Sequence, residues 1–248
     1  MADISREAIV LAAGGRAVLL QIAHPSIGLG VAEHSDFEQA PLHRLHGTLA
    51  FVYAISLGTE GDVAIVRREV NRAHAPVRGP SYSAMDPDLQ LWVAATLYDS
   101  AIVMWERIHG PIEPDAADLL YREYARLGTE LQLPHDAWPA DRAAFASYWN
   151  AQVESLEVSD AARQISRSLL WSRKLPWYLR ALLPIVRLVT AGMLPASVRE
   201  QFDFAWSTAR GRRLERLLAV AGAFNRVAPS GLRHYPSRYY LRRLRARP

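Results

Sequence analysis

Three polar residues in apolar segments of the chain could together bind a cofactor. Arg44 and Thr48 lie in RLHGTLAFVYAISLG, and His74 closes the later segment EGDVAIVRREVNRAH. Residues four apart share one face of a helix, so Arg44 and Thr48 point the same way. On the second helix, three valines precede His74 at helical spacing and share its face (Val63, Val66 and Val70).

A buried arginine needs an anion, and an imidazole in apolar surroundings needs a hydrogen-bond partner or a metal. A haem would satisfy both, through a propionate and its iron. Each residue alone has a simpler interpretation. His74 could bond a carbonyl, Arg44 could pair with Glu38 or Asp36, and Thr48 could bond a helix carbonyl. The three residues by themselves leave these alternatives open.

Composition limits the chemistry that the chain can perform. Its 248 residues are half hydrophobic, which is enough for one domain with an internal ligand pocket. The absence of cysteine excludes disulfides, thiolate nucleophiles, iron–sulfur clusters and thiolate-ligated haem. A di-iron site in a helical bundle uses a Glu-x-x-His pair on each of two helices, and the sequence contains one such pair, Glu106–His109, which disfavours that site.

The pattern predicts a single all-α globular domain. Ala, Leu and Arg are abundant, and no sustained alternation typical of strands occurs. His24 before Pro25 should interrupt the helix, and Gly28 and Gly30 should allow a bend or a close approach to a ligand. One helix should contain Arg44 and end at Gly58-Thr59, and the next should run from an N-cap at Thr59 to a stop at Pro76. Further helices are expected at residues 6–22, 87–109, 113–133, 138–156, 158–170, 177–191 and 197–224.

Basic charge gathers at the C-terminal end. From residue 205 onward there are eleven arginines and one acidic residue, Glu215. We therefore divide the chain into a domain, 1–235, and a basic tail, 236–248. The tail should be solvated, with attraction to anionic lipid as the alternative. No nucleic-acid-binding motif accompanies the charge, so no nucleic-acid partner is expected.

The sequence shows neither a secretory signal nor a spanning segment. Its most lipophilic window, 179–194, is interrupted by two arginines and a proline, whereas a spanning helix needs about 20 mostly uncharged residues. We therefore expect a cytoplasmic protein, with peripheral contact to a membrane through the basic tail as an open alternative.

Several segments together resemble one known family. They are LLQIAHPSIGLGVAEHSDF, PLHRLHGTLAFVYAISLGT, VNRAHAPVRG, YSAMDPDLQLWVAATLYDS and MLPASVREQFDF, spread over residues 9–235. The family is DUF2236, which contains the MpaB-type oxygenases and the rubber oxygenases (latex clearing proteins). The resemblance implies a globin-reminiscent helical fold with one haem b in an internal pocket. It also implies an oxygenase that uses O2 on a small or lipophilic organic substrate, by oxidative cleavage of a carbon–carbon double bond.

The resemblance also assigns roles to residues. In rubber oxygenases a histidine downstream of an Arg-x-x-x-Thr pair is the proximal iron ligand, and Arg44, Thr48 and His74 match this pattern. His74 is therefore the expected metal ligand, and Arg44 and Thr48 are the expected cofactor-binding and catalytic residues. His24, in the AHP motif, would either line the distal side of the haem or fix its loop through hydrogen bonds.

The chain departs from the rubber oxygenases at two positions. Gly47 stands where they carry a lysine that caps the iron, directly before Thr48. The position of their proposed catalytic glutamate falls near Gly28, and Glu33 and Asp36 are the nearest carboxylates. These departures leave an alternative function open, that of a haem-binding sensor or carrier without turnover.

Overall fold

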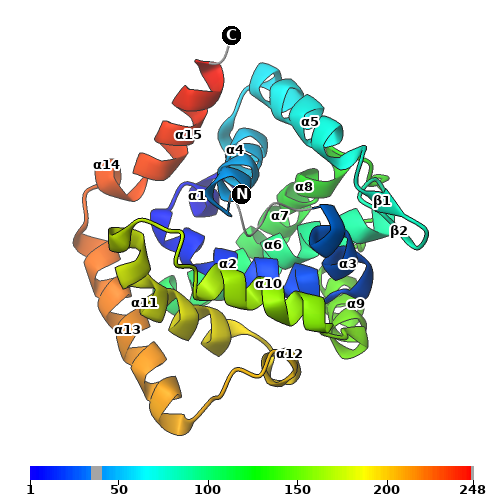
Figure 1. The fold of residues 1–248 in the computed structure, drawn as a ribbon. Coiled ribbons are helices and arrows are strands. Elements are labelled where there is room, and N and C mark those ends of the chain that lie inside the picture. The colour runs from blue at the N-terminus through cyan, green and yellow to red at the C-terminus, as the bar shows by residue number, and fades with distance from the viewer. Residues whose placement is uncertain (35–40, 247–248) are drawn as a thin grey trace.

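The computed structural model describes the backbone of residues 1–34 and 41–246, and their side chains except those of 41–45. Helices form most of this part of the chain, and its one sheet is a short two-stranded hairpin. The helices pack into one body around a shared core (Figure 1). The prediction of a single all-α domain is confirmed.

The N-terminal segment differs from the single helix predicted over residues 6–22. That prediction was wrong, because Glu7 has an extended backbone and a 3₁₀ helix follows it. The interruption at His24 is present, with an extended backbone there and a bend of 100° between residues 8–23 and the next helix. The elements are α1 (Ala2–Ser5), η1 (Ala8–Ala13), α2 (Gly14–Ala23) and α3 (Pro25–His34).

The predicted end of α4, the start of α5 and both ends of α6 are present in the structure. The Thr59 hydroxyl accepts from the Asp62 N–H, and the Asp62 carboxylate accepts from the Thr59 N–H at 2.8 Å. Asp86 caps the long helix, and Gly110 ends it with φ 89°. The elements are α4 (Pro41–Leu57), α5 (Glu60–His74), β1 (Arg78–Gly79), β2 (Tyr82–Ser83) and α6 (Pro87–His109).

The remaining helices lie near the predicted segments, with two additional breaks. Segment 113–133 divides into α7 and α8, and the segment after Pro195 divides into α12 and α13, with Asp203 at φ 59° between them. The elements are α7 (Pro114–Tyr124), α8 (Arg126–Thr129), α9 (Arg142–Ser155), α10 (Asp160–Leu170), α11 (Trp177–Met193), α12 (Ala196–Gln201), α13 (Thr208–Val227), α14 (Ser230–Arg233) and α15 (Tyr235–Arg245).

Helix α6 forms the centre of the fold, and α2 packs along it. The Trp92 indole donates to the Leu20 carbonyl at 3.1 Å, and the Gln21 amide donates to the Thr96 hydroxyl at 2.9 Å. These two bonds fix the last turn of α2. The corner at His24 is therefore held against the first turns of α6.

A buried arginine joins three helices. Arg16 of α2 is only 4 % exposed, and its Nε donates to the Met193 carbonyl of α11 at 2.7 Å. Its Nη1 donates to the Ser100 hydroxyl at 2.8 Å and lies 2.6 Å from the Asp99 carboxylate, both on α6. Burial raises the pKa of the Asp99 carboxyl, and Arg16 opposes that rise.

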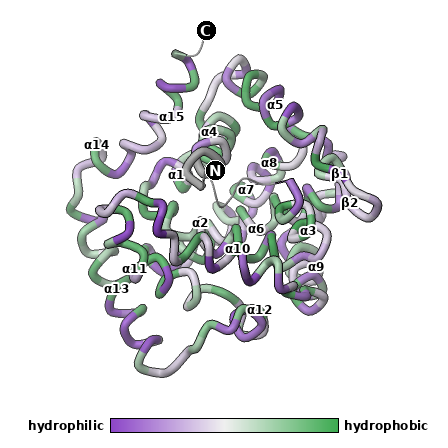
Figure 2. The backbone as a smooth tube through the Cα atoms, viewed as in Figure 1, coloured by the Kyte–Doolittle hydropathy of each residue, from purple (hydrophilic) through white to green (hydrophobic). Residues whose placement is uncertain are grey.

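The basic residues near the C-terminus form helix α15, which covers α4. The Tyr240 ring lies 5.7 Å from the Tyr53 ring and 5.7 Å from the His46 ring, both on α4. Leu244 is fully buried in the main core. In Figure 2, α4 is largely hydrophobic and α5 is more hydrophilic. The hydrophobic character of α4 agrees with its position under α15.

Within the described residues, no single helix is long and apolar enough to cross a membrane. Residues 8–23 and α3 meet the length and composition criteria only when they are joined across their 100° bend.

Candidate functional site

The predicted site residues lie on three elements. His74 is the last residue of α5 and is half-buried, with its Nδ1 atom inside the protein. His24 forms the corner between α2 and α3 and is also half-buried. Thr48 is exposed on α4. Arg44 belongs to α4 as predicted, but its side chain lies outside the described residues.

The start of α5 is fixed by an ion pair with the C-terminal helix. The Asp62 side chain is almost fully buried and receives bonds from Nε and Nη2 of Arg245 at 3.1 and 2.7 Å. Arg245, with help from Thr59, lowers the pKa of the Asp62 carboxyl to about 2. Val63 and Val66 then bury the next turns of α5 in the core.

The far end of α5 is fixed by a chain of polar contacts. The His74 carbonyl accepts from the Val77 N–H at 2.9 Å, which turns the chain toward the hairpin. Nearby, the Gln132 amide donates to the Asn71 side chain, and the Gln90 side chain accepts from the Gln132 N–H, both at 2.9 Å. His74 is thereby held close to the start of α6.

The hairpin docks on α3 through Tyr82. Its hydroxyl donates to the Glu33 carboxylate, and this bond raises the pKa of the Tyr82 hydroxyl to about 12. The ring leaves no room for larger neighbours, because a Cβ on Gly79 or Gly30 would lie 2.5 or 3.1 Å from it. The His34 ring meets Tyr82 edge-on at 6.0 Å. Glu33 is the described carboxylate that follows Gly28 most closely in the sequence. Its bond with Tyr82 therefore anchors the hairpin.

The 77–86 segment bonds His74 through its backbone and acts on His24 only through the charge of Asp86. The Val77 N–H bonds His74, the Ala84 N–H bonds the Val77 carbonyl at 2.9 Å, and Asp86 lies close enough to act on the charge of His24. Burial lowers the pKa of the His24 imidazole, and Asp86 partly opposes this effect. A neutral His24 carries one N–H and one lone pair for a ligand.

Three buried polar atoms near these elements lack a hydrogen-bond partner among the described residues. They are Nδ1 of His24 and the hydroxyl oxygens of Tyr53 and Ser56 on α4. Tyr53 and Ser56 were not among the predicted site residues, although a hydroxyl within an apolar helix was a signal for them. Buried polar groups are normally hydrogen-bonded, so each such atom indicates a place for a ligand or a water.

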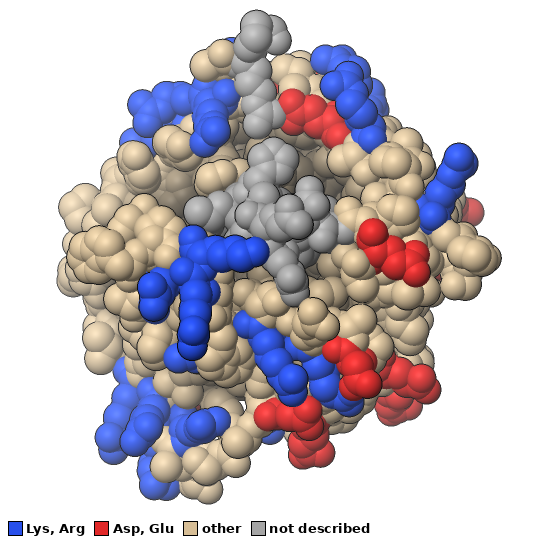
Figure 3. Space-filling view, in the orientation of Figure 1, with Lys and Arg blue, Asp and Glu red and all other residues tan. Residues whose placement is uncertain are grey.

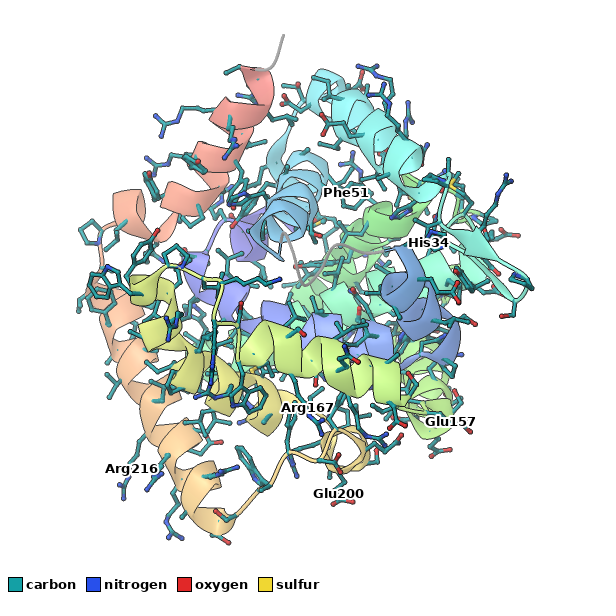
Figure 4. All side chains as sticks on the ribbon, in the orientation of Figure 1. His34, Phe51, Glu157, Arg167, Glu200 and Arg216 are labelled. Atoms are coloured by element: carbon teal, nitrogen blue, oxygen red, sulfur yellow. The ribbon has the colours of Figure 1, made fainter. Side chains whose placement is uncertain are left out.

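Helix α4 is open on one side at the Thr48 turn. A Cβ added to Gly47 would meet no described atom within 4 Å, and both Gly47 and Thr48 are exposed. No described side chain bonds the Thr48 hydroxyl, which remains available to a ligand. Figure 4 labels Phe51 on this helix in the upper part of the view, where its side chain is buried, and His34 on α3 to its right.

The residues present fit a haem in their chemistry. The described residues contain no group of three or more His, Cys, Asp or Glu side chains that could hold a bare metal ion. A haem iron needs only one axial imidazole from the protein, because the porphyrin supplies the other ligands. His74 offers that imidazole, and no described atom lies within 4 Å of a Cβ added at Gly47 on α4.

Two surface hollows lie elsewhere. One is lined by residues of the α10–α11 turn and α11, and the other by residues 199–206. None of the four predicted site residues lines either hollow. The structure bonds His74 to the 77–86 segment and places Asp86 where its charge acts on His24, and it records no hydrogen bond from Thr48 to either histidine.

Comparisons with known proteins agree with the resemblance seen in the sequence. Residues 2–223 match a family model described as ER-bound oxygenase mpaB/B′/rubber oxygenase, catalytic domain. Two uncharacterized proteins, of Mycobacterium bovis and Mycobacterium tuberculosis, are each 37 % identical over 222 residues. The match covers 86 % of this chain and 87 % of each relative. No solved structure matches the chain. The chain belongs to the mpaB/rubber oxygenase catalytic-domain family.

Proposed function

We propose that this protein is a haem b-dependent oxygenase that acts on a small or lipophilic organic substrate with O2. The family, which is named for oxygenases, supports the reaction class. The observation that carries the haem assignment is His74, a half-buried imidazole at the end of a helix fixed at both ends. When bound, haem supplies the redox chemistry, and oxidative cleavage of a carbon–carbon double bond is the reaction proposed.

The chain itself holds and orients the reactants. His74 would hold the haem iron, and α5 sets the position of His74 through Asp62 at one end and Val77 at the other. Arg44 would pair with a propionate, and Thr48 would offer its free hydroxyl on the next turn of α4. His24, kept neutral by burial, would bond a polar group of the ligand through Nδ1.

A haem titration of the purified protein tests the assignment. The protein should give a Soret band, a pyridine haemochrome spectrum and about one iron per chain. His74→Ala should abolish or shift the Soret band. His135→Ala is the matched control, because His135 is exposed and distant in sequence from the site. An unchanged Soret band in His74→Ala would exclude His74 as the ligand.

The second candidate function is a haem-binding sensor or carrier without turnover. Gly47 favours this second function, because the rubber oxygenases carry a lysine at that position. No described side chain on the open side of α4 replaces that lysine. Incubation with unsaturated isoprenoids under O2 and under argon separates the two. Oxygen-dependent carbonyl products support the oxygenase, whereas haem binding without products supports the sensor or carrier.

A further inference from the structure

The first half of α11 presents an apolar stripe to solvent. Trp177 is 79 % exposed, and Tyr178, Leu182 and Ile185 are each about half exposed. Their spacing places them on one side of the helix, with Val186 at the edge of the stripe. Exposed apolar surface on this scale is typical of an interaction site rather than of an ordinary surface.

The second half of the same helix is firmly anchored. Val189 and Met193 are buried in a small core with α13, and the Met193 carbonyl accepts the bond from Arg16. The exposed half is therefore continuous with an anchored helix, and Leu183 on its inner side is buried. It does not depend on a loose end of the chain.

Basic side chains surround the stripe. Residues 161–199 contain no acidic residue. Arg173, Lys174 and Arg180 are exposed, and none of the ion pairs recorded among the described residues involves them. Figure 3 shows basic side chains over the α10–α11 turn and uncharged surface beside them, with the acidic side chains toward the other side of the view.

A hollow next to the stripe combines aromatic rings with guanidinium groups. Trp171 and Trp177 line it together with Arg173, Arg180 and Arg187, and its volume is about 500 Å³. The Arg187 guanidinium lies 5.0 Å from the centre of the Trp171 ring and donates to the Leu170 carbonyl at 3.0 Å. This lining suits a phosphate that is attached to an apolar molecule.

We propose that residues 171–186 form a surface that binds an anionic lipid bilayer. Trp and Tyr prefer the interface between lipid and water, and an apolar stripe flanked by arginine lies in that plane. Arg173, Lys174 and Arg180 would pair with lipid phosphates, because these side chains are all positively charged. The surface is separate from the basic C-terminal residues, and it does not depend on the proposed haem.

Vesicle flotation with the full-length protein tests the proposal. The protein should bind phosphatidylcholine vesicles that contain about one third phosphatidylglycerol, and bind pure phosphatidylcholine much more weakly. The double variant Arg173→Gln/Arg180→Gln should weaken binding about 30-fold. Trp177→Ser/Tyr178→Ser should weaken it about tenfold or more. Circular dichroism spectra that match wild type show that each variant is folded.

A charge-matched control places the effect on α11. Arg212→Gln/Arg216→Gln removes two exposed charges from α13, where Arg216 projects outward at the lower end of the view (Figure 4). It should change binding less than about threefold. Trp177→Phe should keep binding but lose most of the blue shift in tryptophan emission on vesicle addition.

Two results would overturn the proposal. One is equal loss of binding in both charge pairs, which would indicate general attraction between a basic protein and anionic lipid. The other is absence of vesicle binding by the wild-type protein. If light scattering then shows a dimer that Trp177→Ser dissociates, a second copy of the chain covers the stripe.

Discussion

Asp62→Asn should destabilise the protein in a pH-dependent way. The contacts with Arg245 and Thr59 lower the pKa of Asp62 from 3.8 to about 2, so the folded state favours the ionised carboxylate. A shift of that size corresponds to about 2 kcal/mol. The Arg245 side chain is half exposed, and solvent screening reduces the expected loss to about 1–2 kcal/mol.

The sign of the pH dependence follows from the lowered pKa. The stabilisation is complete above the unfolded-state pKa, so wild type and Asp62→Asn should differ fully at pH 7. It falls to about half near pH 3 and is lost as the pH approaches 2. Urea unfolding of both proteins at pH 7 and pH 3 measures this difference. Equal differences at the two pH values would refute the role of the carboxylate charge.

Two companion variants locate the effect. Arg245→Met removes the partner and keeps the Thr59 cap, so it should cost part of the same free energy. Arg242→Met is the control, because Arg242 lies exposed on α15 and bonds only the Arg238 carbonyl, at 3.3 Å. If Arg242→Met lowers the free energy of unfolding as much as Arg245→Met does, then general changes in α15, and not the loss of the Asp62 ion pair, cause the destabilisation.

Two further substitutions test other parts of the fold. Gly79→Ala places a methyl group 2.5 Å from the Tyr82 ring, so it should displace the hairpin and lower stability by about 1–3 kcal/mol. The added methyl group can be accommodated only if the Tyr82 ring moves. An unchanged melting temperature of Gly79→Ala would contradict the close contact between Gly79 and the Tyr82 ring. Arg16→Met leaves the Asp99 carboxylate buried without its cation and should cost about 3–5 kcal/mol at neutral pH. A recovery of stability on acidification, as Asp99 takes up a proton, is the expected signature in urea unfolding.

Local signals predicted the elements that carry the site. Thr59 and Pro76 bracket α5, and the structure ends that helix at His74. Capping and helix termination depend on neighbours in sequence, so a single sequence reveals them. The same holds for Asp86 and Gly110, which bound α6.

Long-range contacts could not be predicted in this way. Arg245 pairs with Asp62 across 183 positions, and charge composition alone made the end of the chain look like a solvated tail. Gly28 and Gly30 lie inside α3, where the Ile22 carbonyl and the Tyr82 ring leave no room for a Cβ. Each of these facts depends on which segments meet in space, and one sequence does not encode that directly.

The same difference between local and long-range contacts applies to the residues of the candidate site. The position of His74 at the end of an apolar stripe follows from helical periodicity. The burial of the Tyr53 and Ser56 hydroxyls does not, because it depends on what packs over α4. Tyr240 of α15 lies over Tyr53, and that contact joins residues far apart in the chain.

Helix α15 covers α4, so the segment that must fold together is longer than the segment matched by the family model. The family match ends at residue 223, but Leu244 is buried in the main core and Arg245 holds the start of α5. A chain cut after residue 223 would uncover Tyr53 and release α5 at its first turn. Recombinant fragments should therefore keep α15, and a purification tag or fluorophore is better placed at a position remote from Arg245.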